Sequence, residues 1–234
     1  MYKTIKPKLS IIVFIIIVLG LSYNAFIKRF IPVFKMVSTN KVVIIDPGHG
    51  NIDKGAFHSE SGVHESPINL AVALQLKEAL QKQKHDVVLT RDKDTVELQG
   101  NAKELKRRID LAKEHNADIL VSIHVNQFPD PQYFGAQCFY NPQVPESKLL
   151  ALLVQEELKT IDSENFREAL PQDLFILRES AVPSILVEMG FLSNPQDREK
   201  LQDPTYQKKI ASAIGEGIKR YFANDTPKLT PLYD

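Results

Sequence analysis

Short apolar runs alternate along the chain with longer segments in which apolar residues recur every three or four positions. Residues 41–45 and 86–90 are rich in β-branched side chains, and the segment that Pro67 opens has helical spacing. A second helical segment, 103–115, leads into another apolar run at 118–123. Short apolar runs are typical of buried strands and the longer spacing of helices. The pattern predicts strand, helix, strand, helix, strand.

The second half of the chain continues this alternation. Strands are predicted at 134–140, 174–177 and 184–187, and helices at 149–161 and 206–222. Strands interleaved with helices are typical of a parallel sheet that is buried on both sides. We therefore expect an α/β fold, a single domain with a mostly parallel, roughly six-stranded sheet flanked by helices on both faces.

The N-terminus has the pattern of a membrane-targeting segment. Lys3, Lys6 and Lys8 precede the apolar run from Leu9 to Leu21, and the residues that follow contain no Ala-x-Ala cleavage pattern. A cleaved secretory signal closes on small residues, so an uncleaved signal or anchor is favoured. The predicted organisation is an N-terminal membrane anchor at 1–27, a connector at 28–40, a globular domain at 41–223 and a flexible tail at 224–234.

Charge and cysteine content narrow the possible partners. The 234 residues include 29 Lys and Arg and 29 Asp and Glu, which gives a formal net charge of zero. Because the basic residues are spread along the chain and form no stripe, nucleic acid is not an expected partner. Cys138 is the single cysteine. A single cysteine cannot form a disulfide within the chain, and its apolar neighbours in the sequence predict a buried thiol with no catalytic or metal-binding role.

Three functional side chains follow predicted strands: His49, His124 and Glu188. Ligands of open α/β sheets bind beyond the carboxyl ends of the strands, so these side chains are expected to meet there. Histidine and carboxylate ligands suit zinc, and a hydrolytic zinc site uses three protein ligands and leaves a position open. The spacing alone leaves the third ligand open. The candidates are Glu65, His64, His58 and Asp53, with a slight preference for Glu65 because it lies next to the predicted helix.

Other polar residues near these strands allow further hypotheses. Asp46 could orient a ligand histidine through a hydrogen bond. Arg91 and Arg108 could hold backbone or substrate carboxylates, although a structural use is favoured for both. A serine triad built on Ser122 and His124 is disfavoured, because the sequence lacks the sharp nucleophile turn that such a serine requires.

Three stretches of the chain carry a family resemblance. They are Asp46-Pro47-Gly48-His49-Gly50, Ser122-Ile123-His124-Val125-Asn126 and Val187-Glu188-Met189-Gly190-Phe191-Leu192-Ser193-Asn194. In this order they resemble the motifs of the zinc-dependent N-acetylmuramoyl-L-alanine amidases of the third amidase class. The resemblance extends over residues 41 to about 222. It implies that 41–223 is the catalytic amidase domain, with Zn²⁺ on His49, Glu65 and His124 and with Glu188 as the catalytic carboxylate.

The resemblance also implies a substrate and a cellular setting. The substrate is peptidoglycan, cut between N-acetylmuramic acid and L-alanine by a domain that is anchored to the membrane outside the cytoplasm, or is secreted to the cell envelope or spore cortex. The bare N-terminus and Phe134-Gly135-Ala136-Gln137 are most similar to the germination-specific spore-cortex amidases. That subfamily implies a peptidoglycan deacetylase as a pathway partner in making muramic lactam, or an accessory protein. Asn51 departs from the family, which usually has glycine there.

Two other functions fit the same residues. A membrane-tethered zinc peptidase would use similar ligands to cut within the stem peptide, and a non-catalytic peptidoglycan-binding module would keep the fold without turnover. Product analysis separates the first from an amidase, because only an amidase releases intact stem peptides that begin with L-alanine. Replacement of Glu188 by glutamine separates the second from an amidase, because it would leave the function of a binding module unchanged but would abolish turnover by an enzyme.

Overall fold

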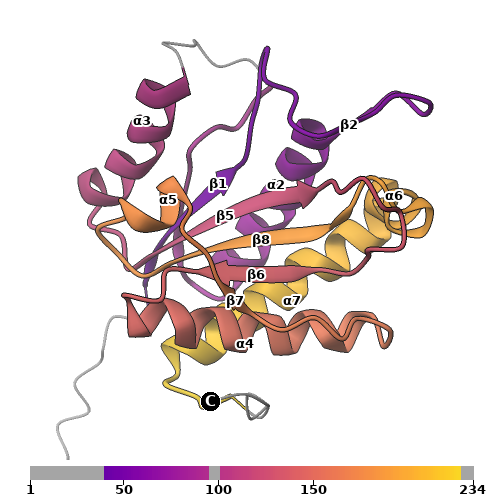
Figure 1. Cartoon of the computed structure of the whole chain (residues 1–234). Coiled ribbons are helices and arrows are strands. Elements are labelled where there is room, and N and C mark those ends of the chain that lie inside the picture. Colours follow the sequence, from indigo (N-terminus) through magenta and orange to yellow (C-terminus); the bar gives the residue numbers. More distant parts are fainter. Residues whose placement is uncertain (1–39, 95–100, 228–234) are drawn as a thin grey trace, which may run out of the picture. The chain divides into compact units, whose positions relative to one another are not determined.

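A six-stranded sheet forms the centre of the molecule in the computed structural model, which describes residues 40–94 and 101–227 (Figure 1). The strand order is β4-β1-β5-β8-β6-β7. The strands are β1 (Val42–Pro47), β4 (Asp86–Leu89), β5 (Ile119–Asn126), β6 (Gln137–Tyr140), β7 (Leu170–Pro171) and β8 (Ser184–Phe191). The pairs from β4 to β8 are parallel, and β6 runs antiparallel to β8. The predicted mostly parallel sheet is confirmed.

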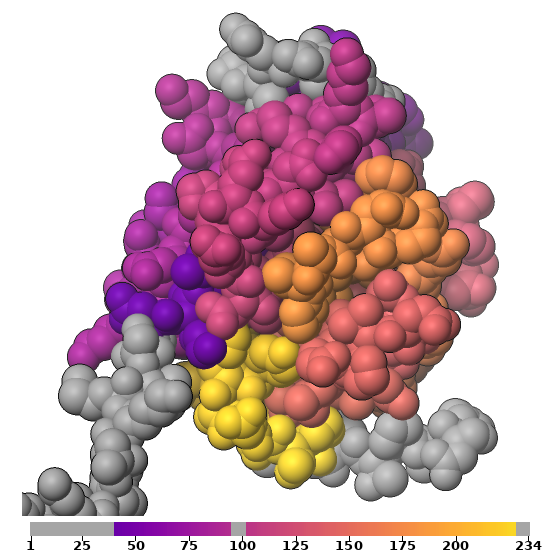
Figure 2. Space-filling view, turned by 90° about the vertical axis from the view of Figure 1, so that its left-hand side faces the viewer, coloured from indigo at the N-terminus to yellow at the C-terminus, as the bar shows by residue number. Residues whose placement is uncertain are grey.

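Helices cover both faces of this sheet. The larger apolar core lies between the sheet and three long helices, α2 (Glu65–Lys82), α4 (Pro145–Ile161) and α7 (Pro204–Phe222). A smaller core lies on the opposite face under α3 (Asn101–Glu114) and α5 (Phe175–Arg178). In the space-filling view of Figure 2, the magenta surface of α3 and the orange surface around α5 lie side by side over this second face.

The alternation of side chains along the strands decides which residues reach the smaller core. Val43 and Ile45 of β1 belong to the larger core, whereas Ile44 belongs to the smaller one. Leu120 of β5 and Leu186 of β8 share the face of Ile44. Since side chains two apart in a strand point the same way, polar residues further along these strands emerge on the α3 and α5 side. The candidate site lies there.

Several elements differ from the sequence prediction. Residues 174–177 do not form a strand, because Phe175–Arg178 is the short helix α5 and the edge strand is β7. A short apolar run fits either element by periodicity, so tertiary packing decides between them. The helix expected from Pro67 begins at Glu65. The structure adds α6 (Pro195–Gln202) and a hairpin of β2 (Phe57–His58) and β3 (Val63–His64).

The predicted membrane anchor at 1–27 lies outside the described residues, as does the connector up to residue 39. The end of the tail, 228–234, also lies outside them. Within the part of the chain that is described, none of the helices combines the length and the apolar character that crossing a membrane requires.

Candidate metal centre

His49, Glu65 and His124 converge on one point at the end of the sheet, and their ligand atoms all lie within 4.8 Å of one another. His49 Nε2 lies 3.3 Å from Glu65 Oε2, and His124 Nδ1 lies 2.8 Å from Glu65 Oε1. Ligands at about 2.0–2.1 Å from a tetrahedral zinc ion are separated by roughly 3.3 Å. The three side chains therefore have the chemistry and the spacing that a metal ion with three protein ligands requires.

The loop after β1 presents His49 in an unusual backbone conformation. His49 has φ 60° and Asn51 has φ 58°, both in the left-handed region that non-glycine residues seldom adopt. The His49 Nδ1 donates a hydrogen bond to Asp53 Oδ2 at 2.8 Å. Because a carboxylate only accepts, this bond keeps a proton on Nδ1, so Nε2, which faces Glu65, is the nitrogen that a metal ion can take once its own proton is lost. Asp53 thus orients a candidate ligand and is not itself in the cluster.

Glu65 is the first residue of α2, and its carboxylate is held from several sides. It is 3% exposed. The backbone N–H groups of Ala56 and Val125 donate to its two oxygens at 2.8 and 3.0 Å, and Asn69 Nδ2 donates at 3.0 Å. These bonds fix both oxygens, so the carboxylate faces the two histidines in one orientation.

The charges of the cluster favour a cation between these groups. Burial alone would lower the pKa of His49, but Glu65 and Asp53 raise it to about 9. The pKa of His124 is also raised against the effect of burial, by Glu65 and by Glu188. Burial opposes ionisation of Glu65, yet the two histidines hold the pKa of its carboxyl well below the usual range. A site that stabilises a proton in this way also stabilises a metal ion, which replaces the proton on binding.

Glu188 lies beside the cluster without being one of its three members. It pairs in register with His124 across β5 and β8. Its Oε2 is buried and has no hydrogen-bond partner among the described residues. Burial raises the pKa of Glu188 to about 7, against the opposing effect of His124. A carboxylate with a pKa near neutrality can both accept and return a proton, which is the requirement for a general base that later acts as an acid.

Two glycines lie so close to the candidate ligands that a side chain at either position would overlap with them. A Cβ on Gly48 would lie 2.2 Å from His124 Cε1, and a Cβ on Gly55 would lie 2.4 Å from Glu65 Oε2. Both distances are far below van der Waals contact. Glycine is therefore required at Gly48 and Gly55 so that backbone and ligand side chains can approach.

Asp46 does not have the role expected from the sequence. Its buried carboxylate accepts hydrogen bonds from Thr90 Oγ1 at 2.6 Å, Ser122 Oγ at 2.7 Å and Arg108 Nη1 at 2.8 Å. These bonds and the Arg108 charge keep the pKa of Asp46 low in spite of its burial. The acid that orients a histidine is Asp53. The sequence indicated Asp53 only as a possible ligand, although its spacing of four from His49 within one tight loop was a usable signal.

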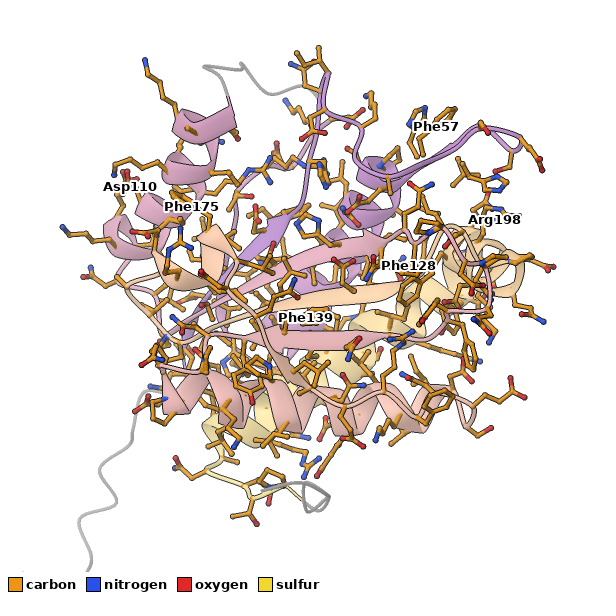
Figure 3. The ribbon with its side chains drawn as sticks, in the orientation of Figure 1. Phe57, Asp110, Phe128, Phe139, Phe175 and Arg198 are labelled. Atoms are coloured by element: carbon orange, nitrogen blue, oxygen red, sulfur yellow. The ribbon has the colours of Figure 1, made fainter. Side chains whose placement is uncertain are left out.

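The structure also separates the ligand candidates that the sequence left open. His58 bonds through Nδ1 to Ser61 Oγ, and His64 stacks on Phe57 with ring centroids 4.4 Å apart, so neither belongs to the cluster. Figure 3 shows Phe57 on the hairpin that leads into α2, away from the sheet. His124 and Glu188 were expected just after their strands, but both lie within them, in β5 and β8.

A cavity of about 200 Å³ opens from the cluster toward α3 and α5. Its lining combines the polar groups of the β1 loop with apolar side chains of the two helices. The lining residues are Asp46, Gly48, His49, Gly50, Asp53, Glu104, Leu105, Arg108, His124 and Ile176. The candidate centre is thus open on the face of the smaller core.

Most of the chain is similar in sequence to known proteins. Residues 43–220 match the family model Amidase_3, described as N-acetylmuramoyl-L-alanine amidase. The germination-specific N-acetylmuramoyl-L-alanine amidase of Bacillus subtilis (strain 168) is 34% identical over 193 residues, which cover 79% of this chain and 81% of that protein.

Solved structures show the same similarity. The CwlD amidase from Clostridioides difficile, in complex with the GerS lipoprotein, matches with a TM-score of 0.75 and 40% identity, over 80% of this chain and 100% of that chain. An N-acetylmuramoyl-L-alanine amidase from Clostridium difficile 630 matches with a TM-score of 0.74 and 35% identity, over 80% and 98% of the two chains.

Proposed function

The chain belongs to the N-acetylmuramoyl-L-alanine amidases, and from this premise we propose that His49, Glu65 and His124 hold a zinc ion beside the catalytic residue Glu188. Members of this family hydrolyse the amide bond between N-acetylmuramic acid and L-alanine in peptidoglycan, and this chain is such a hydrolase. The observation that carries the proposal is the convergence of three ligand atoms within 4.8 Å next to a buried carboxylate.

The donor set favours zinc over other common ions. Two imidazole nitrogens and one carboxylate oxygen suit zinc, whereas magnesium and calcium prefer oxygen ligands throughout. When bound, zinc supplies Lewis acidity to the scissile carbonyl and lowers the pKa of the attacking water. Asp53 keeps one proton of His49 on Nδ1, so that Nε2 is the nitrogen at which the ion would replace a proton. The family is one in which zinc dependence is general, which supports this assignment.

Glu188 is the group proposed to move the proton. An amide needs a deprotonated nucleophile and a protonated leaving nitrogen. The unpartnered Oε2 of Glu188 can accept the proton of the attacking water and deliver it to the alanine nitrogen as the C–N bond breaks. Its raised pKa supports both steps, because a carboxyl near neutrality holds the proton only transiently.

We also propose the cellular setting of the enzyme. The similarity to a germination-specific amidase supports a role in the spore cortex, where removal of stem peptides would precede muramic lactam formation with a peptidoglycan deacetylase. In the Clostridioides difficile structure the amidase binds a lipoprotein, which supports an accessory protein for this chain as well. Residues 1–27 would anchor the catalytic domain, 41–223, outside the cytoplasm.

One experiment tests bond choice and metal dependence together. Peptidoglycan is digested with the purified chain, with and without a chelator, and the products are analysed by mass spectrometry. We expect intact stem peptides beginning with L-alanine, loss of product with the chelator, and recovery on addition of zinc. Cleavage within the stem peptide would contradict the assigned bond, and unchanged product in the chelator would contradict the metal centre.

A further inference from the structure

Two buried arginines bind the backbone of the loop that carries His49. Arg108 of α3 donates to the carbonyl oxygens of Pro47 at 2.9 Å and His49 at 2.7 Å. Arg91 donates to the carbonyl oxygens of Pro47 and Gly48, both at 2.9 Å. Three successive carbonyl groups are therefore bound by guanidinium groups, and that of Pro47 is bound by both arginines. The two side chains are 5% and 4% exposed, for Arg108 and Arg91 respectively.

Arg108 also binds two carboxylates of the protein. Its Nη1 also donates to Asp46 Oδ1 at 2.8 Å, and its Nε donates to Glu104 Oε1 at 3.3 Å. Asp46 and Glu104 raise the pKa of the guanidinium although burial opposes the charge. Because its nitrogens are engaged by the protein, Arg108 is not placed to bind a substrate carboxylate, even though it borders the cavity. Its hydrogen bonds instead hold the backbone carbonyl groups of Pro47 and His49 in place.

The loop needs such bonds because its conformation is costly. The left-handed backbone of His49 is strained for a non-glycine residue and persists only where the surroundings hold it. The carbonyl oxygens of Pro47, Gly48 and His49 also need hydrogen-bond donors, because an unpaired backbone acceptor away from water is costly. A guanidinium group has several donors in a rigid plane, so it can bind two carbonyl oxygens and a carboxylate at once, which a lysine ammonium cannot reproduce with the same geometry.

From these contacts we infer that Arg108 is a positioning residue for metal binding. It fixes the backbone at His49 from the α3 side, so that Nε2 of His49 is held at the correct place relative to Glu65 Oε2. Metal affinity therefore depends on a side chain that touches neither the ion nor the substrate. This inference rests on the proposed metal centre, since it assigns to Arg108 a role in that centre.

The test measures zinc affinity directly. The full-length chain and its Arg108→Lys variant are freed of metal and titrated with zinc against a chromophoric chelator. Groups that orient metal ligands typically change affinity by about 10- to 100-fold, so Arg108→Lys is expected to raise the zinc Kd within that range. The visible absorption of the cobalt-loaded variant is expected to change in shape, because the position of one ligand changes.

The neighbouring arginine supplies a matched control. Arg107 lies on the same helix, its side chain is 49% exposed, and it donates to the carbonyl of Thr90 at 2.9 Å. Arg107→Lys is expected to bind zinc within about twofold of wild type. A purely structural role for Arg108 would lower the melting temperature of the metal-free protein and leave the Kd and the cobalt spectrum unchanged, which would overturn the inference.

A second variant covers the case in which Arg108→Lys does not fold. Asp46→Asn with Arg108→Gln removes both charges of the buried pair, and Glu104, which also loses Arg108, keeps its ion pair with Arg107 at 3.5 Å. It is also expected to raise the zinc Kd at least tenfold. If wild type binds zinc and this folded variant binds it equally well, the inference is overturned while the metal centre stands. If wild type itself binds no zinc, both are overturned.

Discussion

His124 and Glu188 are register partners on the neighbouring parallel strands β5 and β8. Partners of this kind project to the same face of a sheet from strands about 4.8 Å apart. The distance between the proposed ligand and the proposed proton carrier is therefore set by backbone hydrogen bonds and not by the metal. Glu188 can consequently be changed without disturbing the ligand set, which makes its chemical role testable on its own.

Glu188→Gln is expected to lower kcat by about 10²- to 10⁴-fold, because the amide cannot accept the proton of the attacking water. Zinc content near one equivalent and substrate binding should persist, since Glu188 is not a proposed ligand. Turnover of purified muropeptides and metal analysis measure the two effects. Glu179→Gln, which alters the solvent-exposed partner of Arg178, is the control and should retain full activity. Activity of Glu188→Gln near the wild-type level would leave the proton-transfer role without support.

His49→Ala is expected to reduce bound zinc strongly, whereas His58→Ala should keep close to one equivalent. Both changes remove an imidazole from the segment between β1 and α2, but only His49 belongs to the cluster with Glu65 and His124. His58 bonds to Ser61 instead. Metal analysis after dialysis against a weak chelator distinguishes them. Equal zinc loss in the two variants would show that the ligand set is wrong.

The stability of the metal-free protein should depend on pH through Glu188. Burial raises the pKa of this carboxyl to about 7 from its ordinary value of 4.5. Between these values the folded state binds more protons than the unfolded state, so this group makes folding less favourable as pH rises through the window. At about pH 8 the raised pKa lowers the free energy of unfolding by on the order of 2 kcal/mol, a figure reduced to allow for partial solvent screening of the carboxyl.

Glu188→Gln removes that penalty and gives the measurement. In the presence of a chelator, the variant should be more stable than wild type at about pH 8, and the two should converge below about pH 4, where the carboxyl is protonated in both states. Urea unfolding at several pH values measures the difference. Equal stability of the two proteins across the whole range would show that the Glu188 carboxyl titrates normally.

Gly48→Ala is expected to abolish zinc binding or to destabilise the fold, because the new Cβ would lie 2.2 Å from the His124 ring. Gly215→Ala is the matched control. Its Cβ would lie 3.6 Å from the Cβ of Ala79, an ordinary contact between α7 and α2, and removing a helical glycine stabilises by about 0.5–1 kcal/mol. Thermal unfolding and zinc titration of both variants measure the contrast. Tolerance of Gly48→Ala would mean that His124 occupies another position.

The amino-acid pattern determines much of this protein directly. Strand and helix periodicities at β1, α2, β4, α3 and β5 are local properties, since each depends on whether a run of residues can bury one face. The order of three polar motifs, each at the end of an apolar run, further indicates one site at one edge of a parallel sheet. His49, His124 and Glu188 could be named as candidates on that basis alone.

Only the tertiary structure decides among residues that the pattern leaves equivalent. Asp53, His58, His64 and Glu65 all belong to one short segment, yet only Glu65 joins the two histidines, because α2 begins at Glu65 and the backbone of neighbouring segments binds its carboxylate. Likewise the partner of Asp46 is Arg108, 62 positions away. Such contacts depend on packing between distant elements, and no local spacing specifies them.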